Sequence, residues 1–324
     1  MITLKDVESA AKAIQGIATR TPLLRSIELD RLTGGRIYVK AECLQLTGSF
    51  KFRGAYNRLS RLSAEEKARG VVAYSSGNHA QGVAYAAHML GIEATIIMPK
   101  DAPKMKIENT RSHGATIVLY DRMNEVREDI GAKFVEDTGA ILVPPYEDDY
   151  IMAGQGTSAL EALEDITLYE NKPFDDYIVN AGGGGLLAGS STVMSSLSPS
   201  TCVYSAEPEL YNDHARSFAS GVRERVAGDA PTSICDAIMT PEPGETTFAI
   251  NKENVKGGLA VSDQEIKEAM RFAALHLKII VEPGGAAALA TVLSGKLETK
   301  GRVIGLTATG GNVDPAFFTE VLNG

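Results

Sequence analysis

Tyr177-Ile-Val-Asn-Ala-Gly-Gly-Gly-Gly-Leu-Leu-Ala-Gly-Ser190 is the stretch that decides the fold. Its first residues are apolar, as in a buried strand, and the residues after the glycines are apolar, as in a buried helix. Four successive glycines allow backbone N–H groups to converge on an anion, and the following helix adds its positive N-terminal end. A flexible turn is the alternative. However, four glycines lose much conformational entropy on ordering, so a bound group should compensate. The predicted phosphate cradle is Gly182, Gly183, Gly184, Gly185 and Leu186.

This turn differs from two other phosphate-binding loops. No Gly-Lys-Ser/Thr follows it, as a P-loop requires. It also does not match Gly-x-Gly-x-x-Gly with an acidic residue about twenty positions further on. A nicotinamide dehydrogenase is therefore a weaker interpretation than an enzyme with another phosphorylated cofactor.

Short apolar strands followed by turns and helical patterns recur along the chain. Strands that are apolar nearly throughout, alternating with helices, are typical of parallel sheets covered on both faces. We therefore predict the α/β class. The predicted strands are residues 70–75, 94–98, 115–120, 177–180, 202–205 and 303–306.

The composition excludes several classes of protein. The 324 residues suffice for one large or two associated domains. A net charge of −9, with acidic and basic residues interspersed, argues against a nucleic-acid partner. There is no apolar run long enough for a membrane span, and the start at Met1 lacks a secretion signal. Three widely spaced cysteines, Cys43, Cys202 and Cys235, suit a reducing compartment, so we expect a cytoplasmic protein.

A lysine motif links the glycine turn to a specific cofactor. Thr47-Gly-Ser-Phe-Lys-Phe-Arg-Gly54 resembles the lysine motif of the pyridoxal 5′-phosphate (PLP) dependent threonine/serine dehydratase and serine racemase family. The resemblance implies that Lys51 carries PLP as a Schiff base and that Phe50 packs beside the ring. A lysine between aromatic residues is also expected to be partly desolvated, which lowers its pKa and frees the amine for imine formation.

A second motif, Tyr74-Ser-Ser-Gly-Asn-His-Ala-Gln-Gly82, follows a strand and opens a helix. Small polar residues and N–H groups at a helix N-terminus suit a carboxylate. In the family this loop binds the substrate, which implies contacts from Ser75, Ser76, Gly77, Asn78 and His79. Asn78 would also bond the ring hydroxyl, and Ser76 would exchange a proton on the face opposite the lysine. For His79, a buried histidine with a structural role is an equal alternative.

A third motif is Leu306-Thr-Ala-Thr-Gly-Gly-Asn-Val-Asp314, in which the resemblance assigns Thr309 to the pyridine nitrogen. A neutral hydroxyl cannot hold that nitrogen protonated as an aspartate can. The cofactor ring would then be a weaker electron sink. A weaker sink disfavours transamination and suits β-elimination.

An acidic segment, Ala206-Glu-Pro-Glu-Leu-Tyr-Asn-Asp213, resembles the cation site of serine racemases and related dehydratases. The resemblance implies Mg²⁺ or Ca²⁺ bound by Glu207, the Tyr211 carbonyl and Asp213. Oxygen ligands of this kind select hard cations. A solvated acidic loop is the alternative.

The resemblance also implies the architecture. It predicts fold type II: two doubly wound domains with mainly parallel sheets and PLP in the cleft between them. We place the large domain at residues 1–51 and 146–324 and the small domain at 52–145. The family expectation is a homodimer.

The activity expected from the resemblance is dehydration and deamination of a β-hydroxy-α-amino acid, with L-threonine or L-serine as first choice. Serine racemase and 3-hydroxyaspartate dehydratase are the alternatives within the family. Arg127 bears on this choice, since it could pair with a second carboxylate, although a solvated helix face beside Glu125 and Glu128 is slightly favoured. From a different class, the chain could be a non-catalytic ligand-binding protein on the same scaffold. The intact Lys51, Ser76 and Thr309 argue against that.

Overall fold

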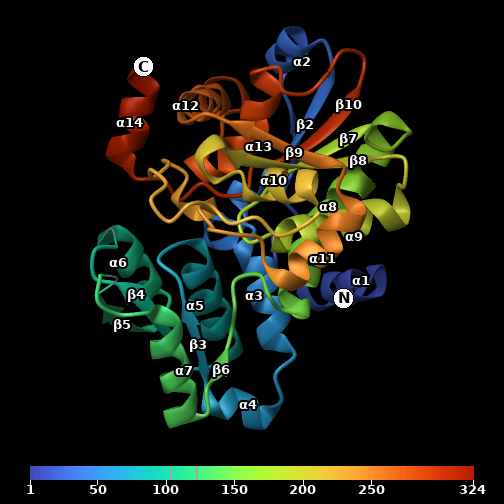
Figure 1. The fold of residues 1–324 in the computed structure, drawn as a ribbon. Coiled ribbons are helices and arrows are strands. Elements are labelled where there is room, and N and C mark those ends of the chain that lie inside the picture. Colours follow the sequence, from blue (N-terminus) through green and yellow to red (C-terminus); the bar gives the residue numbers. More distant parts are fainter. Residues whose placement is uncertain (103, 122) are drawn as a thin grey trace.

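The computed structural model describes residues 1–324 except 103 and 122, and it contains two mainly parallel sheets with helices around them (Figure 1). The larger sheet has six strands in the order β1-β2-β10-β7-β8-β9. All neighbours are parallel except β1, which pairs antiparallel with β2 at one edge. The strands are β1 (Leu23–Arg25), β2 (Arg36–Lys40), β7 (Asp176–Asn180), β8 (Cys202–Pro208), β9 (Gly257–Val261) and β10 (Val303–Thr307).

Helices cover both faces of this sheet, as its apolar strands predict. Ile178 packs into a core cluster with α2, α12 and α13, whereas Tyr177 and Val179 pack into a second cluster with α1, α8 and α9. The helices associated with the six-stranded sheet are α1 (Leu4–Ile14), α2 (Ile27–Thr33), α8 (Asp149–Glu170), α9 (Gly185–Leu197), α10 (Asp213–Ser220), α11 (Glu245–Asn254), α12 (Asp263–Phe272), α13 (Pro283–Leu293) and α14 (Pro315–Asn323).

The smaller sheet has four parallel strands in the order β5-β4-β3-β6. They are β3 (Val71–Tyr74), β4 (Ala94–Pro99), β5 (Thr116–Tyr120) and β6 (Ile141–Leu142). Helices α3 and α5 pack on one face and α7 on the other. The helices of this half are α3 (Lys51–Ser60), α4 (Ala64–Arg69), α5 (Asn78–Leu90), α6 (Lys104–Ser112) and α7 (Arg127–Thr138).

Short helical turns complete the chain: η1 (Glu42–Leu44), η2 (Leu46–Gly48), η3 (Glu209–Tyr211), η4 (Asp236–Ile238) and η5 (Ala273–Leu277). In the described part of the chain, no helix combines the length and apolar character needed to cross a bilayer.

The predicted fold class is confirmed, and the six predicted strands correspond to β3, β4, β5, β7, β8 and β10. The sequence analysis missed the other strands because their local signals are weak. β6 has only two residues, and β9 begins with two glycines. β1 and β2 are short and contain basic residues, so their sequences do not show the apolar pattern of a buried strand.

A buried group of charges ties α3 to the six-stranded half. The Arg53 side chain is fully buried; its Nε lies 2.8 Å from Glu42 Oε2, and its Nη1 lies 2.8 Å from Glu161 Oε1. Glu161 also pairs with buried Lys40 at 2.6 Å. Two cations therefore balance two carboxylates in the interior, which offsets much of the cost of burying each charge.

Replacing Arg53 by methionine should lower the free energy of unfolding by roughly 3–5 kcal/mol, because two buried carboxylates lose their main partner. Urea unfolding followed by circular dichroism measures this. Arg20→Met is the matched control, since Arg20 is half exposed and pairs with Glu164 and Asp165 on the same helix α8. The Arg20→Met variant should lose less than about 1 kcal/mol of unfolding free energy. Equal losses in the two variants would contradict the special role of the buried group.

Candidate active site

A cavity of about 620 Å³ lies where strands of both sheets end. In α/β folds, loops at the carboxyl ends of parallel strands form such sites. Here the loop after β3 comes from one sheet, and the segments after β7 and β10 come from the other. The cavity wall contains every residue that the sequence analysis assigns to the cofactor or the substrate: Phe50, Lys51, Ser75, Ser76, Gly77, Asn78, His79, Arg127, Gly182, Gly183, Gly184, Gly185, Leu186 and Thr309.

Lys51 is the first residue of α3 and extends into this cavity. Its Nζ donates a hydrogen bond to the Pro145 carbonyl at 2.8 Å and lies 5.0 Å from the centre of the Phe50 ring. Desolvation lowers the pKa of the Lys51 ammonium to about 8. The neutral, nucleophilic amine is therefore accessible near physiological pH.

The glycine turn forms as predicted between β7 and α9, and α9 begins at Gly185. Gly184 has a φ of +93°, in the region that favours glycine. A Cβ on Gly183 would lie 2.2 Å from the Tyr146 ring, so no larger residue fits this position. The turn thus places backbone amides and a helix N-terminus at the cavity, an arrangement that suits a phosphate.

The loop after β3 leads into α5, which begins at Asn78. Within the loop, the Gly77 backbone N–H donates to Ser75 Oγ at 3.2 Å. The His79 ring Nε2 bonds the Val143 carbonyl at 2.8 Å, so this nitrogen carries the proton. Burial lowers the pKa of His79 to about 3, and its ring is neutral. The side chain of His79 therefore has a structural contact, whereas the first turn of α5 offers backbone N–H groups to an anion.

Thr309 follows β10, and its carbonyl accepts a hydrogen bond from the Phe50 backbone N–H at 3.1 Å. This bond connects the end of β10 to the turn that carries Lys51. The lysine motif and the Thr309 motif, far apart in sequence, thus share one wall of the cavity.

Glu282 is a residue of the cavity that the sequence analysis missed. It is the N-cap residue of α13, just before Pro283, and its carboxylate accepts a hydrogen bond from Asn78 Nδ2. Asn312 Nδ2 donates to Asn78 Oδ1 at 2.7 Å, so the Asn78 amide is held from both ends. Burial raises the pKa of Glu282 to about 7. A glutamate before a proline predicts only a helix start, and no sequence signal indicates the contact with Asn78.

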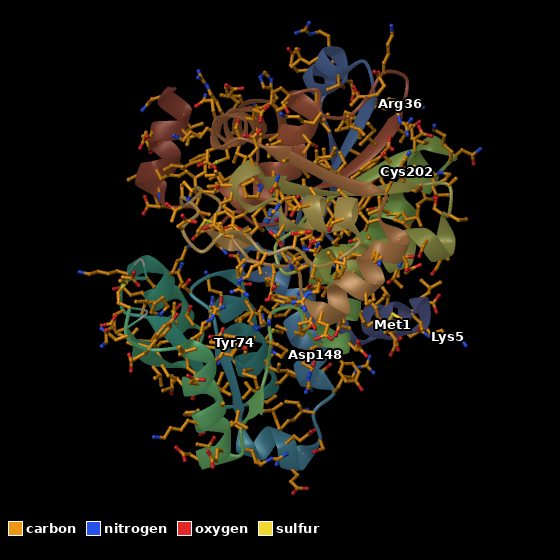
Figure 2. The ribbon with its side chains drawn as sticks, in the orientation of Figure 1. Met1, Lys5, Arg36, Tyr74, Asp148 and Cys202 are labelled. Atoms are coloured by element: carbon orange, nitrogen blue, oxygen red, sulfur yellow. The ribbon has the colours of Figure 1, made fainter. Side chains whose placement is uncertain are left out.

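Arg127 is the first residue of α7 and lies at the cavity wall. Its guanidinium is 5.3 Å from the centre of the Tyr74 ring, and its Nε donates to Glu128 Oε1 at 2.8 Å. Tyr74 ends β3 in the half that holds the four-stranded sheet (Figure 2). The arginine is half exposed, so it meets both the cavity and solvent.

The acidic segment lies outside this cavity, at the end of β8 and the start of α10. The Glu207 carboxylate accepts backbone N–H bonds from His214 and Ala215 at 2.7 and 2.9 Å. Burial raises the pKa of Glu207 well above its usual value, and the Asp213 charge adds to this. Within the described residues, no three His, Cys, Asp or Glu side chains gather to hold a metal, and buried Asp213 Oδ2 has no hydrogen-bond partner. Two buried carboxylates with an unpartnered oxygen fit a cation that uses backbone or water oxygens as further ligands.

Comparisons with known proteins point to one family of enzymes. The family model described as pyridoxal-phosphate dependent enzyme matches residues 14–310. The chain is 46% identical to an L-threo-3-hydroxyaspartate ammonia-lyase of Pseudomonas, over 98% of each chain. It is 41% identical to an L-threonine ammonia-lyase of Thermotoga maritima, over 100% of this chain and 79% of that one. The crystal structure of serine racemase from Dictyostelium discoideum superposes with a TM-score of 0.90 at 36% identity, covering 97% of this chain and 99% of that one.

The environment of Lys51 predicts an unusual pH dependence. In protein without cofactor, the rate of Lys51 acetylation by acetic anhydride should reach half its maximum near pH 8, since the lowered pKa populates the neutral amine there. Lys256 is the internal control, because its contact with the Tyr204 hydroxyl raises its pKa above 10.5. Peptide mass spectrometry gives both rates. A shared midpoint for the two lysines would refute the assigned environment of Lys51.

Proposed function

Since the chain belongs to the pyridoxal-phosphate dependent enzymes, in the group of threonine/serine dehydratases and serine racemases, we propose that it converts a small β-hydroxy-α-amino acid into a 2-oxo acid and ammonia by β-elimination. L-Threonine and L-serine are the first candidate substrates. The observation that carries the proposal is the desolvated Lys51 amine, which shares one cavity with the glycine turn and the N-terminus of α5.

When bound, pyridoxal phosphate supplies an electron sink that acidifies the Cα–H bond of an amino acid. The residues around the cavity fit each part of this cofactor. Lys51 would bond its aldehyde carbon, and Gly182–Leu186 would bind its phosphate. The Thr309 hydroxyl would meet the pyridine nitrogen, Asn78 would meet the ring hydroxyl, and Phe50 would pack beside the ring.

The protein's own groups would bind the substrate and move its protons. The loop of Ser75–His79 would hold the α-carboxylate with small polar groups and the amides of α5. Once the amino group of the substrate has replaced it, the neutral Lys51 Nζ would take the proton from Cα as general base, and hydroxide would leave from Cβ as the Cα–Cβ double bond forms. Ser76 Oγ is the candidate to return a proton to Cα from the other face. Such a return would give serine racemisation, the alternative activity.

A second candidate substrate is 3-hydroxyaspartate, and the position of Arg127 favours it. The guanidinium lies at the cavity wall, where a second carboxylate of the substrate could form a charge-assisted pair. Two relatives, 46% and 42% identical to this chain, are L-threo-3-hydroxyaspartate ammonia-lyases. The Gly48-Ser-Phe-Lys51 sequence points instead to threonine or serine, because hydroxyaspartate enzymes often carry alanine at the serine position.

We also propose a cation site at Glu207, the Tyr211 carbonyl and Asp213, for Mg²⁺ or Ca²⁺. The pKa values of the two carboxylates, raised mainly by burial, support it, because a bound cation would stabilise their charged forms in the interior. Measuring activity with and without each cation, and after chelation, tests this site.

The domain boundaries and the assembly are proposals as well. We propose a small domain at residues 52–145 and a large domain at 1–51 and 146–324; the four-stranded sheet, which spans residues 71–142, supports this division. A cytoplasmic homodimer is proposed from the family resemblance. The three free cysteines agree with a reducing compartment.

Purified protein given PLP should develop an absorption band in the near-visible range, and Lys51→Ala should abolish it. Release of 2-oxo acid is then measured from L-threonine, L-serine and L-threo-3-hydroxyaspartate, with chiral analysis of the remaining serine. Product from at least one substrate is expected. The band without product from any of them would favour the non-catalytic interpretation, and absence of the band would refute PLP binding.

Arg127→Gln separates the candidate substrates. If hydroxyaspartate is the substrate, kcat/KM for it should fall roughly 10- to 100-fold, the cost of losing a charge-assisted contact, while the value for L-threonine changes less than about threefold. Arg31→Gln is the control, because Arg31 is an exposed arginine paired with Glu28 on α2 and lies outside the cavity. An equal fall in kcat/KM for hydroxyaspartate and L-threonine would rule out a specific contact between Arg127 and the second carboxylate.

A further inference from the structure

Side chains outside the cavity hold the carbonyl groups of the glycine turn. His214 Nε2 lies 2.7 Å from the Gly182 carbonyl, and Thr247 Oγ1 donates to the Gly183 carbonyl at 2.6 Å. Asn251 Nδ2 donates to the Gly184 carbonyl at 3.2 Å, beside the helical bond from Ala188. The three donors come from α10 and α11. The sequence analysis assigned no role to any of them.

These contacts determine which way the amides of the turn point. In a trans peptide the C=O and the following N–H point in opposite directions. The glycines of the turn line the cavity, whereas His214, Thr247 and Asn251 do not. The carbonyls of Gly182, Gly183 and Gly184 are therefore drawn away from the cavity. The N–H groups of the following residues are turned toward it.

The donors are themselves fixed. A carbonyl only accepts hydrogen bonds, so His214 Nε2 carries the proton. The ring packs against Phe218, with centres 5.8 Å apart. At the start of α11, the Thr247 backbone N–H donates to Glu147 Oε1 at 3.2 Å. His214 and Thr247 thus have contacts of their own that hold them behind the turn.

We propose that His214, Thr247 and Asn251 are positioning residues that preset the glycine turn for the phosphate of the cofactor. Four glycines would otherwise sample many conformations, and ordering them on binding would weaken affinity. The three side chains provide this order in advance without touching the ligand. The inference rests on the proposed function, since it takes the cofactor phosphate as the bound anion.

Thr247→Val tests the proposal, because valine keeps the shape of threonine and removes the side-chain donor, leaving the Gly183 carbonyl only the longer bond from the Gly244 backbone N–H at 3.2 Å. The dissociation constants of PLP and of pyridoxal, which lacks the phosphate, are measured by absorbance on protein freed of cofactor. Thr247→Val should weaken PLP binding about fivefold to tenfold, the effect of one neutral hydrogen bond, and leave pyridoxal binding within about twofold. Thr247→Ser, which retains the hydroxyl, should restore PLP affinity.

Two further variants complete the experiment. His214→Phe should repeat the selective loss of PLP affinity through an independent contact. Thr291→Val is the matched control: Thr291 is equally buried, its hydroxyl bonds the Ala288 carbonyl in α13, and neither affinity should change. An unchanged PLP affinity in Thr247→Val and His214→Phe, or an equal loss for PLP and pyridoxal, would overturn the proposal. Failure of the proposed function is distinct, because the unaltered protein would then bind neither ligand as an imine.

Discussion

The buried charges around Arg53 fix the helix on which the cavity depends. Arg53 and Lys51 are two positions apart in α3, so their side chains leave the helix on different sides. One side is bound to Glu42 and Glu161 in the protein interior. The other carries the amine into the cavity, against the Pro145 carbonyl. Because the interior pairs resist displacement of α3, the amine has a defined place relative to the glycine turn and the loop after β3.

Burial moves three titratable groups of the cavity, Lys51, His79 and Glu282, toward their uncharged forms. The pKa of Lys51 falls to about 8 and that of His79 to about 3, while the pKa of Glu282 rises to about 7. The positive ends of α5 and α9 remain, because backbone dipoles do not titrate. An anionic ligand therefore meets oriented amides, and the amine that reacts is not locked in its ammonium form.

The sequence predicted those parts of the site that lie in short contiguous motifs. Strand, turn and helix follow one another around the glycines, and Lys51, Asn78 and Thr309 lie in short motifs, so these residues could be placed at one cavity in advance. Contacts between distant segments gave no such signal. Glu282 stands before a proline that marks only a helix start, and Thr247 lies in a polar helix more than sixty residues after the turn it supports. Arg53 belongs to the lysine motif, but Glu42 and Glu161 meet it only in the folded chain.

The chain passes between the two sheets twice, through the segment that leads into α3 and through residues 143–148. Both passages contribute to the cavity wall, with Lys51 on the first and Tyr146 on the second. If one half of the molecule rotates against the other about these two passages, residues in the passages move least. A rotation of the four-stranded half would leave the amine and Tyr146 almost stationary. The loop after β3 is bonded across the cavity through Asn78 to Glu282 and Asn312, so the same rotation would break or lengthen those bonds.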